Sequence, residues 1–169
     1  MTGAYPCPVR FFYDCEFIED GQTIDLVSIG MVSESGREFY AVSTEFDPDR
    51  AGPWVRRHVL PQLPPPSSDA WCSRAQLRES LQEFLDAGVG DIELWAWYAA
   101  YDHVALAQLW GAMPALPPHI PKFTRDLRQR WEDVGKPRLP PAPSNAHDAL
   151  ADAQHNLRRW LVIEENRKK

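Results

Sequence analysis

The chain has 169 residues, 44% of them hydrophobic, and carries a formal net charge of −6 at pH 7. This length provides for one domain with a hydrophobic core, so we expect a single domain over 1–169 with flexible ends at 1–8 and 166–169. The negative charge argues against a protein that coats nucleic acid through a broad basic surface, but it is compatible with an enzyme that grips one end of a strand.

The N-terminal segment and the cysteine pattern predict a protein of a reducing compartment. The N-terminal segment has no basic region followed by an apolar one, and no apolar run is long enough to cross a bilayer, so we expect a cytoplasmic protein with no membrane partner. Cys7, Cys15 and Cys72 are odd in number, widely spaced and without a CxxC pair. This pattern is typical of reduced thiols rather than of a disulfide framework or a zinc site.

The first part of the chain predicts three strands joined by short turns. The apolar run 10–17 is the first, and the segments 23–33 and 37–46 follow after turns that contain Gly21 and Gly36. Short turns between consecutive strands predict an antiparallel meander.

The rest of the chain predicts one further strand among helices and proline-rich loops. Segment 54–60 has room for one or two helical turns, and the prolines of 61–69, 114–121 and 136–143 predict loops. Apolar periodicity, caps and apolar runs predict a helix over 73–87, a strand over 92–98 covered on both faces, and helices over 101–110, 124–134 (with Thr124 as cap) and 146–165. The expected fold class is α/β, with a mixed central sheet flanked by helices.

Two carboxylates are set into the first strand. Alternation places Phe12, Asp14 and Glu16 on one face of the strand, so both acids point the same way. Burying two neighbouring carboxylates is costly unless a cation lies between them, most simply a divalent metal. The alternative is a strand whose acids lie on a solvated edge, and this strand alone does not decide between the two.

Two further acids stand where packing alone does not require them. Asp102 lies between the strand over 92–98 and the helix that follows it, near a helix start. Asp152 lies beside an inward stripe of small and then large residues on the last helix. His147 precedes it by five residues, or about 140° around an ideal helix, so only a loop or first-turn position lets the ring reach the same cleft.

The combination is more specific than any of its members: D-x-E on a first strand, D at a strand-to-helix junction, and H-x-x-x-x-D on a late helix. The chain resembles the DEDDh branch of the 3′→5′ exonucleases, with their ribonuclease H-like fold, and within it the polyadenylate-specific 3′-exoribonucleases of actinobacteria. The resemblance covers nearly the whole chain as one exonuclease domain, and it is carried by DCEFIEDG, REFYAVSTEFDP, LWAWYAAYDHVALAQLWG and HDALADA.

The resemblance implies roles for five residues. Asp14 and Glu16 correspond to the first motif, Asp102 to the second, and His147 with Asp152 to the third. Four carboxylates offer oxygen ligands only, which suits two Mg²⁺ or Mn²⁺ ions, with Asp14 bridging them by the same resemblance. A histidine has an unperturbed pKa near neutrality, so His147 is expected to take a proton from the attacking water.

The resemblance also implies the substrate and the assembly. It implies an RNA with a free 3′ end, with 3′ overhangs of duplex RNA as the substrate, release of nucleoside 5′-monophosphates, and a homodimer. Phe17, Tyr98 and Tyr101 are candidate substrate-binding aromatics, whereas we assign Trp95 and Trp97 to packing. Where relatives commonly have Thr-Gly after the first motif and Asn before the second, this chain has 17–20 (FIED) and Tyr98.

Two other functions remain open from the sequence, and a third lacks support. A DNA 3′→5′ exonuclease of the same fold would keep every catalytic residue. A catalytically silent nucleic-acid-binding module would keep the fold, although the complete set of acids and the histidine speaks against it. A calcium-stabilised structural domain is not supported, because the sequence contains no twelve-residue loop of alternating acids.

Overall fold

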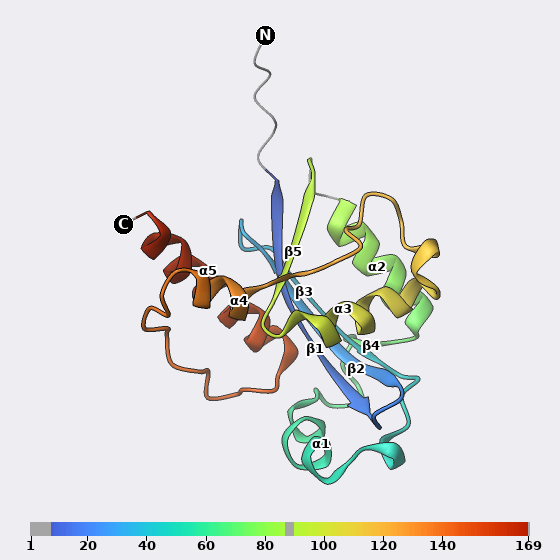
Figure 1. The fold of residues 1–169 in the computed structure, drawn as a ribbon. Helices are drawn as coiled ribbons and strands as arrows, with labels where there is room; N and C mark the ends of the chain where they lie inside the picture. Colours follow the sequence, from blue (N-terminus) through green and yellow to red (C-terminus); the bar gives the residue numbers. More distant parts are fainter. Residues whose placement is uncertain (1–7, 87–89, 169) are drawn as a thin grey trace.

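A six-stranded mixed sheet forms the centre of the molecule in a computed structural model that describes residues 8–86 and 90–168 (Figure 1). The predictions for Cys7, for a flexible start over 1–7 and for the helix end at Ala87 and Gly88 lie outside these residues. The strand order is β4–β3–β2–β1–β5–β6. The strands are β1 (Val9–Glu19), β2 (Ile24–Ser33), β3 (Glu38–Ser43), β4 (Trp71–Cys72), β5 (Ile92–Ala96) and β6 (Arg125–Asp126).

The strand pairing confirms the predicted meander. β1 pairs with β2, and β2 with β3, both antiparallel. β5 runs parallel to β1 and β6 parallel to β5, while the short β4 runs parallel to β3. The sheet is therefore mixed, and β1 lies in its interior with a hydrogen-bonded neighbour on each side. β4 and β6, each of two residues, were not predicted because strands so short leave no periodic pattern.

Helices cover both faces of the sheet. α5 packs against β1 and β2 on one face, with α4 beside it, and α2 and α3 lie over the other face (Figure 1). The helices are α1 (Pro53–His58), α2 (Arg74–Asp86), α3 (Ala99–Ala107), α4 (Leu127–Asp133) and α5 (Ala149–Arg167), with single 3-10 turns at Pro48–Arg50, Leu60–Gln62, Gln108–Trp110 and Met113–Ala115.

The alternation of β1 divides the core into two layers. Phe11 and Tyr13 are fully buried in the larger cluster on the α2 and α3 side. Phe12 is fully buried on the other face, where its ring lies 5.4 Å from that of Trp160 of α5. β5 repeats this arrangement, with Leu94 in the first cluster. Both strands are thus covered on both faces, as predicted for the strand over 92–98, although β5 ends two residues earlier than predicted.

The start of α5 lies unusually close to the sheet. A Cβ atom at Gly30 would lie 2.3 Å from the backbone of Ala149, which is less than any real contact. Gly30 pairs with Asp14 across the β1–β2 ladder. Ala149 and Ala153 are fully buried on the inward side of α5. Small residues on both elements therefore bring the first turn of α5 against the part of β1 that carries the acids.

Three helices differ from the predictions at their ends. α3 begins at Ala99 rather than Tyr101, so Asp102 lies within its first turn. α4 begins after Asp126, whose side chain caps it, and Thr124 is not the cap. The Thr124 hydroxyl instead lies 2.6 Å from the hydroxyl of Tyr13. α5 begins after Asp148 rather than at Ala146, and it continues through Asn166 and Arg167, within the segment expected to be flexible.

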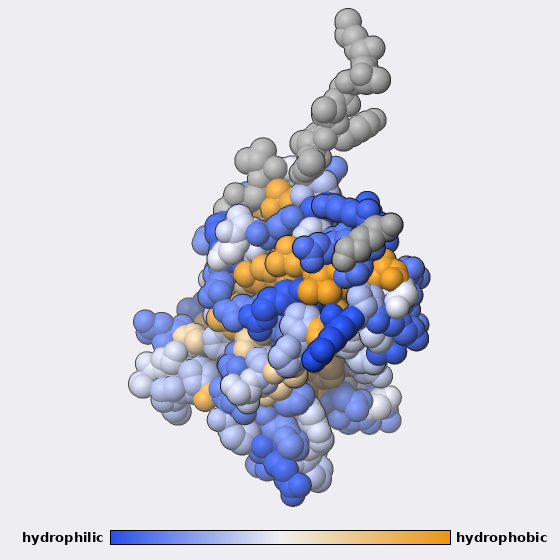
Figure 2. Space-filling model, turned by 90° about the vertical axis from the view of Figure 1, so that its left-hand side faces the viewer, coloured by the Kyte–Doolittle hydropathy of each residue, from blue (hydrophilic) through white to orange (hydrophobic). Residues whose placement is uncertain are grey.

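The surface on the α4 and α5 side carries hydrophobic residues in a band across its upper half, among hydrophilic residues (Figure 2). Leu161 of α5 is one of the large hydrophobic residues exposed on the molecule, at 52%. Among the described residues, the helices are all too short or too polar to span a membrane.

Candidate active site

A single cavity of about 760 Å³ brings the predicted site residues together. It lies between β1, α1, the first turn of α3 and the start of α5. All eight predicted residues line it: Asp14, Glu16, Phe17, Tyr98, Tyr101, Asp102, His147 and Asp152. Segments separated by more than a hundred residues in sequence therefore meet at one place.

β1 contributes two acids from the interior of the sheet. Asp14 pairs with Gly30 and Glu16 with Ser28 on β2, and Glu16 is only 7% exposed. This geometry rules out the alternative of acids on a solvated edge. A register shift follows Glu16, so the regular alternation ends there and Phe17 lines the cavity together with the acids.

Asp102 is a buried residue of the cavity wall and is hydrogen-bonded to β1. Its Oδ1 atom accepts a hydrogen bond of 2.8 Å from the backbone N–H of Cys15, which lies between the two acids of the strand. The helix start thus holds Asp102 in register with β1. Burial raises the pKa of Asp102 to about 7, although the Cys15 N–H opposes this rise.

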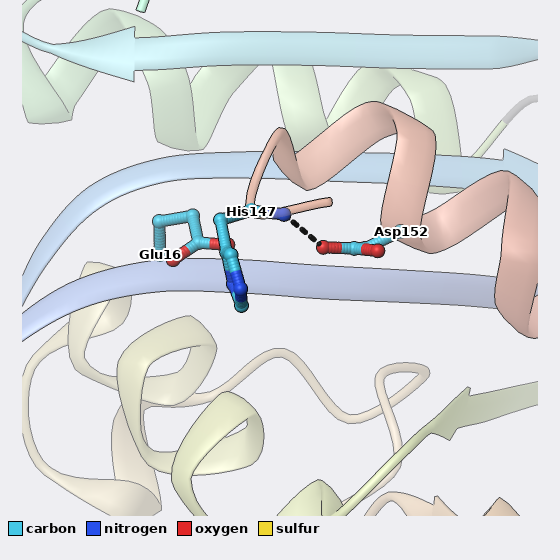
Figure 3. Close-up of side chains that lie close together, drawn as sticks. All are labelled: Glu16, His147 and Asp152. Carbon is cyan, nitrogen blue, oxygen red and sulfur yellow. Dashed lines mark hydrogen bonds and ion pairs between the residues drawn. The ribbon is translucent and has the colours of Figure 1, made fainter. Parts of the chain in front are cut away.

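His147 and Asp152 are joined through the backbone. The N–H of His147 donates a 2.7 Å hydrogen bond to Oδ2 of Asp152 (Figure 3). The imidazole lies beside Glu16, with Nδ1 4.0 Å from Oε1. His147 lies before α5 with φ of 72°, a left-handed conformation that is uncommon outside glycine. The predicted pairing of His147 with Asp152 required this position before the helix, because a regular helix would point their two side chains apart.

The acids repel one another in the absence of a cation. Burial, followed by the charges of Asp102, Glu16 and Asp152, raises the pKa of Asp14 well above its ordinary value. Burial and the charges of Asp152 and Asp102 likewise raise the pKa of Glu16 to about 8. Arg159 of α5 lines the same cavity and opposes the rise at Asp14. Among the residues that line the cavity, carboxylates outnumber cations, so ionising all four acids at once is costly.

This donor set fits hard divalent cations. Ligand atoms of Glu16, His147 and Asp152 lie within 4.8 Å of one another. Asp14 and Asp102 line the same cavity and add further carboxylate oxygens. Oxygen-rich sites of this kind suit Mg²⁺ or Mn²⁺. A cation in this pocket would relieve the repulsion that raises the pKa values of these acids.

Aromatic side chains form the rim of the cavity. The rings of Phe17 and Tyr101 stack with centroids 5.8 Å apart and an interplanar angle of 10°. Tyr98 is 60% exposed and has φ of 60° immediately before α3. Trp54 of α1 was not predicted, yet its ring meets that of His147 edge-on at 4.7 Å. The short segment around Trp54 gave no signal of this contact, because it arises only from the tertiary fold.

The fold is found in a protein of known structure. The structure of S. pombe Pop2p in its Mg²⁺- and Mn²⁺-bound form superimposes with a TM-score of 0.57 and 12% sequence identity, covering 92% of this chain and 82% of that one. At this identity the likeness concerns the fold alone. The chain is thus an α/β protein with a ribonuclease H-like fold, as predicted.

Sequence comparison then gives the family. The sequence model of the family described as the 3′-5′ exoribonuclease Rv2179c-like domain matches residues 9–164. Two Mycobacterium tuberculosis proteins, the 3′-5′ exoribonucleases Rv2179c (strain ATCC 25618 / H37Rv) and MT2234.1 (strain CDC 1551 / Oshkosh), are each 66% identical over 156 residues, which is 92% of this chain and 93% of theirs. The chain belongs to the Rv2179c-like 3′-5′ exoribonuclease domain family. This membership confirms the predicted enzyme class.

Proposed function

We propose that this enzyme is a DEDDh-type nuclease that removes nucleotides from RNA 3′ ends and releases nucleoside 5′-monophosphates. The observation that carries the proposal is the convergence of four carboxylates and one histidine on a single cavity. The family supports the direction of digestion and the class of substrate. We further propose that the chain acts as one exonuclease domain, that it works in the cytoplasm, and that it forms a homodimer.

Two Mg²⁺ or Mn²⁺ ions are the cofactors that we propose for this site. Asp14, Glu16, Asp102 and Asp152 would hold them, with Asp14 shared between the two. When bound, such ions supply positive charge that stabilises the attacking and leaving oxygens of an in-line displacement. The burial of these acids and their raised pKa values support the proposal, because uncompensated charge in such a pocket is costly.

His147 is the general base in this proposal. Its backbone N–H, and not its ring, makes the hydrogen bond to Asp152. Its imidazole lines the cavity beside Glu16. Histidine is the side chain that most often takes a proton from the attacking group in general acid–base catalysis. Trp54 packs edge-on against the ring and thereby limits its rotation.

The aromatic rim supports recognition of the terminal nucleotide. Phe17 and Tyr101 already form a stacked pair at the cavity wall, and we propose that the terminal base continues this stack. Tyr98 is an exposed residue of the same rim and would contact the sugar or the next base. We propose single-stranded 3′ overhangs of duplex RNA as the substrate, with a preference for adenylate ends.

Product analysis tests this function. Matched RNA and DNA duplexes with 3′ overhangs are incubated with Mg²⁺, with Mn²⁺ and with a chelator, and the products are separated by chromatography. We expect nucleoside 5′-monophosphates from the RNA only, and none in chelator. A strong preference for DNA would contradict the RNA assignment, and equal digestion in chelator would contradict the metal. Comparing adenylate with uridylate overhangs tests the adenylate preference, and sizing the protein tests the homodimer.

A further inference from the structure

A row of alternating cations and aromatic rings leads away from the cavity. We name it the cation–aromatic strip, and it consists of Arg159, Trp97, Tyr98, Arg128, Trp131 and Lys136. The guanidinium of Arg159 lies 4.2 Å from the centre of the Trp97 ring, and that of Arg128 lies 4.6 Å from the Trp131 ring. The strip thus joins α5, the β5–α3 turn, α4 and the loop after α4.

The strip is continuous with the active-site cavity. Arg159, Trp97 and Tyr98 line the cavity itself. Arg128 lies 5.9 Å from the Trp97 ring and 6.0 Å from the Tyr98 ring, so it connects the cavity wall to Trp131. A polymer whose end occupies the cavity can therefore extend over the strip without leaving contact with the protein.

The strip is ordered before any ligand arrives. Trp131 donates its indole N–H to the carbonyl of Pro137 at 2.7 Å, which fixes the plane of the ring. Tyr98 is held by a left-handed backbone conformation that presents its ring to solvent. Such strain in an exposed aromatic residue is typical of a functional position. Preorganised rings and cations lose little conformational entropy when a ligand binds.

The charge of the strip differs from that of the whole chain. Arg128, Lys136 and Arg159 are positive, and Glu132 pairs with the first two at 2.8 Å and 3.3 Å. Arg159 faces the acids of the cavity, so the positive charge of the strip lies at Arg128 and Lys136, two cations that share one carboxylate in a chain with a net charge of −6. Basic side chains interleaved with aromatic rings are the features that bind single-stranded nucleic acid, through phosphates and stacked bases.

We propose that the cation–aromatic strip binds the RNA strand behind the terminal nucleotide. The proposal rests on the function proposed above, with the 3′-terminal nucleotide in the cavity. Arg128 and Lys136 contact backbone phosphates, and the bases stack on Tyr98 and Trp131. Glu132 competes with the phosphates for both cations. It therefore lowers the affinity for RNA.

Substrates of two lengths distinguish binding at the strip from binding at the cavity. Arg128→Ala and Lys136→Ala should raise KM about 3- to 10-fold for a single-stranded RNA of about twelve nucleotides, because they remove phosphate contacts. They should leave KM unchanged for a dinucleotide with the same 3′ end, which reaches only the cavity. Arg130→Ala is the matched control, since Arg130 lies on the same helix but pairs with Glu164 of α5 at 3.0 Å. Melting temperatures verify that each variant is folded.

Glu132→Gln should act in the opposite direction. This substitution frees Arg128 and Lys136 from their common partner, so KM for the longer RNA should fall while KM for the dinucleotide stays the same. A side chain that serves only to stabilise α4 would not improve substrate binding when it is neutralised. An unchanged or higher KM for the longer RNA in Glu132→Gln would overturn the proposal.

Direct binding makes the test independent of catalysis. Fluorescence anisotropy of the same longer RNA is measured in the Asp152→Asn background at several salt concentrations. Loss of Arg128 should weaken binding and reduce the slope of log Kd against log salt by about 0.7, the value for one phosphate of a single strand. Equal binding by the Arg128→Ala and Arg130→Ala variants would refute the strip, even if the wild type hydrolyses RNA. Failure of the wild type to hydrolyse either substrate would instead refute the proposed function.

Discussion

His147 shows how one residue can be fixed by its backbone while its ring remains available. Its N–H is bound to Asp152, whereas its imidazole lies near the rings of Trp54 and His58 and has Nδ1 4.0 Å from the carboxylate of Glu16. The positive φ of His147 places the ring in the cavity rather than along α5. A substitution can therefore remove the ring and keep the backbone arrangement.

His147→Asn is the corresponding test, because asparagine tolerates a left-handed backbone better than most residues. We expect kcat to fall about 10²- to 10⁴-fold, the usual contribution of a general base. His147→Ala should lose a similar factor, and both variants should retain the wild-type melting temperature within a few degrees. Nucleotide release from a 3′-tailed RNA measures the loss, and wild-type activity in either variant would remove His147 from the mechanism.

The carboxylate of Asp152 lines the cavity and also accepts a hydrogen bond from the N–H of His147. Asp152→Ala removes both, so we expect nucleotide release to be almost abolished with folding retained. Asp152→Asn keeps an oxygen acceptor for the N–H but removes the charge. Calorimetric titration with Mn²⁺ should show weaker binding in both variants. Activity of the alanine variant at the wild-type level would contradict the site.

At the scale of secondary-structure elements, the site depends on how α5 is placed on the sheet. Gly30 permits the close approach of the α5 start to β2, and Asn156 donates a 3.0 Å hydrogen bond to the carbonyl of Tyr13, directly before Asp14. These two contacts fix α5 against β1 and thereby place Asp152 beside the acids of the strand.

Gly30→Ala tests this placement. The new methyl group would lie 2.3 Å from the backbone of Ala149, so α5 or β2 must shift. We expect a loss of about 1–3 kcal/mol in unfolding free energy, as for other overpacked sites, together with reduced activity. Gly52→Ala is the matched control for stability, because its φ of −66° suits alanine and no atom lies within 4 Å of the added carbon. Equal denaturant midpoints for the two variants would contradict the close approach.

At the scale of the whole molecule, the site lowers the stability of the metal-free protein. Burial raises the pKa of Glu16 to about 8 and that of Asp102 to about 7, compared with ordinary values of 4.5 and 3.8. The folded state therefore holds protons that the unfolded state has already released. Their contribution to stability is complete below about pH 4 and is lost as the pH rises toward 8.

The melting temperature of the protein in chelator should accordingly fall between pH 5 and pH 8. Each unit of raised pKa corresponds to about 1.4 kcal/mol, so the fall is measurable by calorimetry. Glu16→Gln should flatten this dependence because the neutral side chain has no proton to lose. Mg²⁺ or Mn²⁺ should raise the melting temperature more at pH 8 than at pH 5, where protons compete for the same oxygens. A melting temperature independent of pH in chelator would argue against the burial of these acids.

The sequence alone was sufficient for features that depend on local pattern. Alternation in β1 placed Asp14 and Glu16 on one face, apolar periodicity located α2, and the family resemblance carried by the motifs led to the correct enzyme class. Such patterns report on neighbours in sequence, and the backbone geometry of a strand or helix converts them directly into directions in space.

The tertiary structure decided which distant residues meet. The capping role of Asp126 depends on the β6 pairing that precedes α4, and the Thr124 hydroxyl is instead used by Tyr13. The contact of Trp54 with His147 and the cation–aromatic strip likewise join elements far apart in the chain. The physical reason is that packing between elements depends on the shapes of both surfaces and on the small residues that let them approach. No local spacing in this chain records that complementarity.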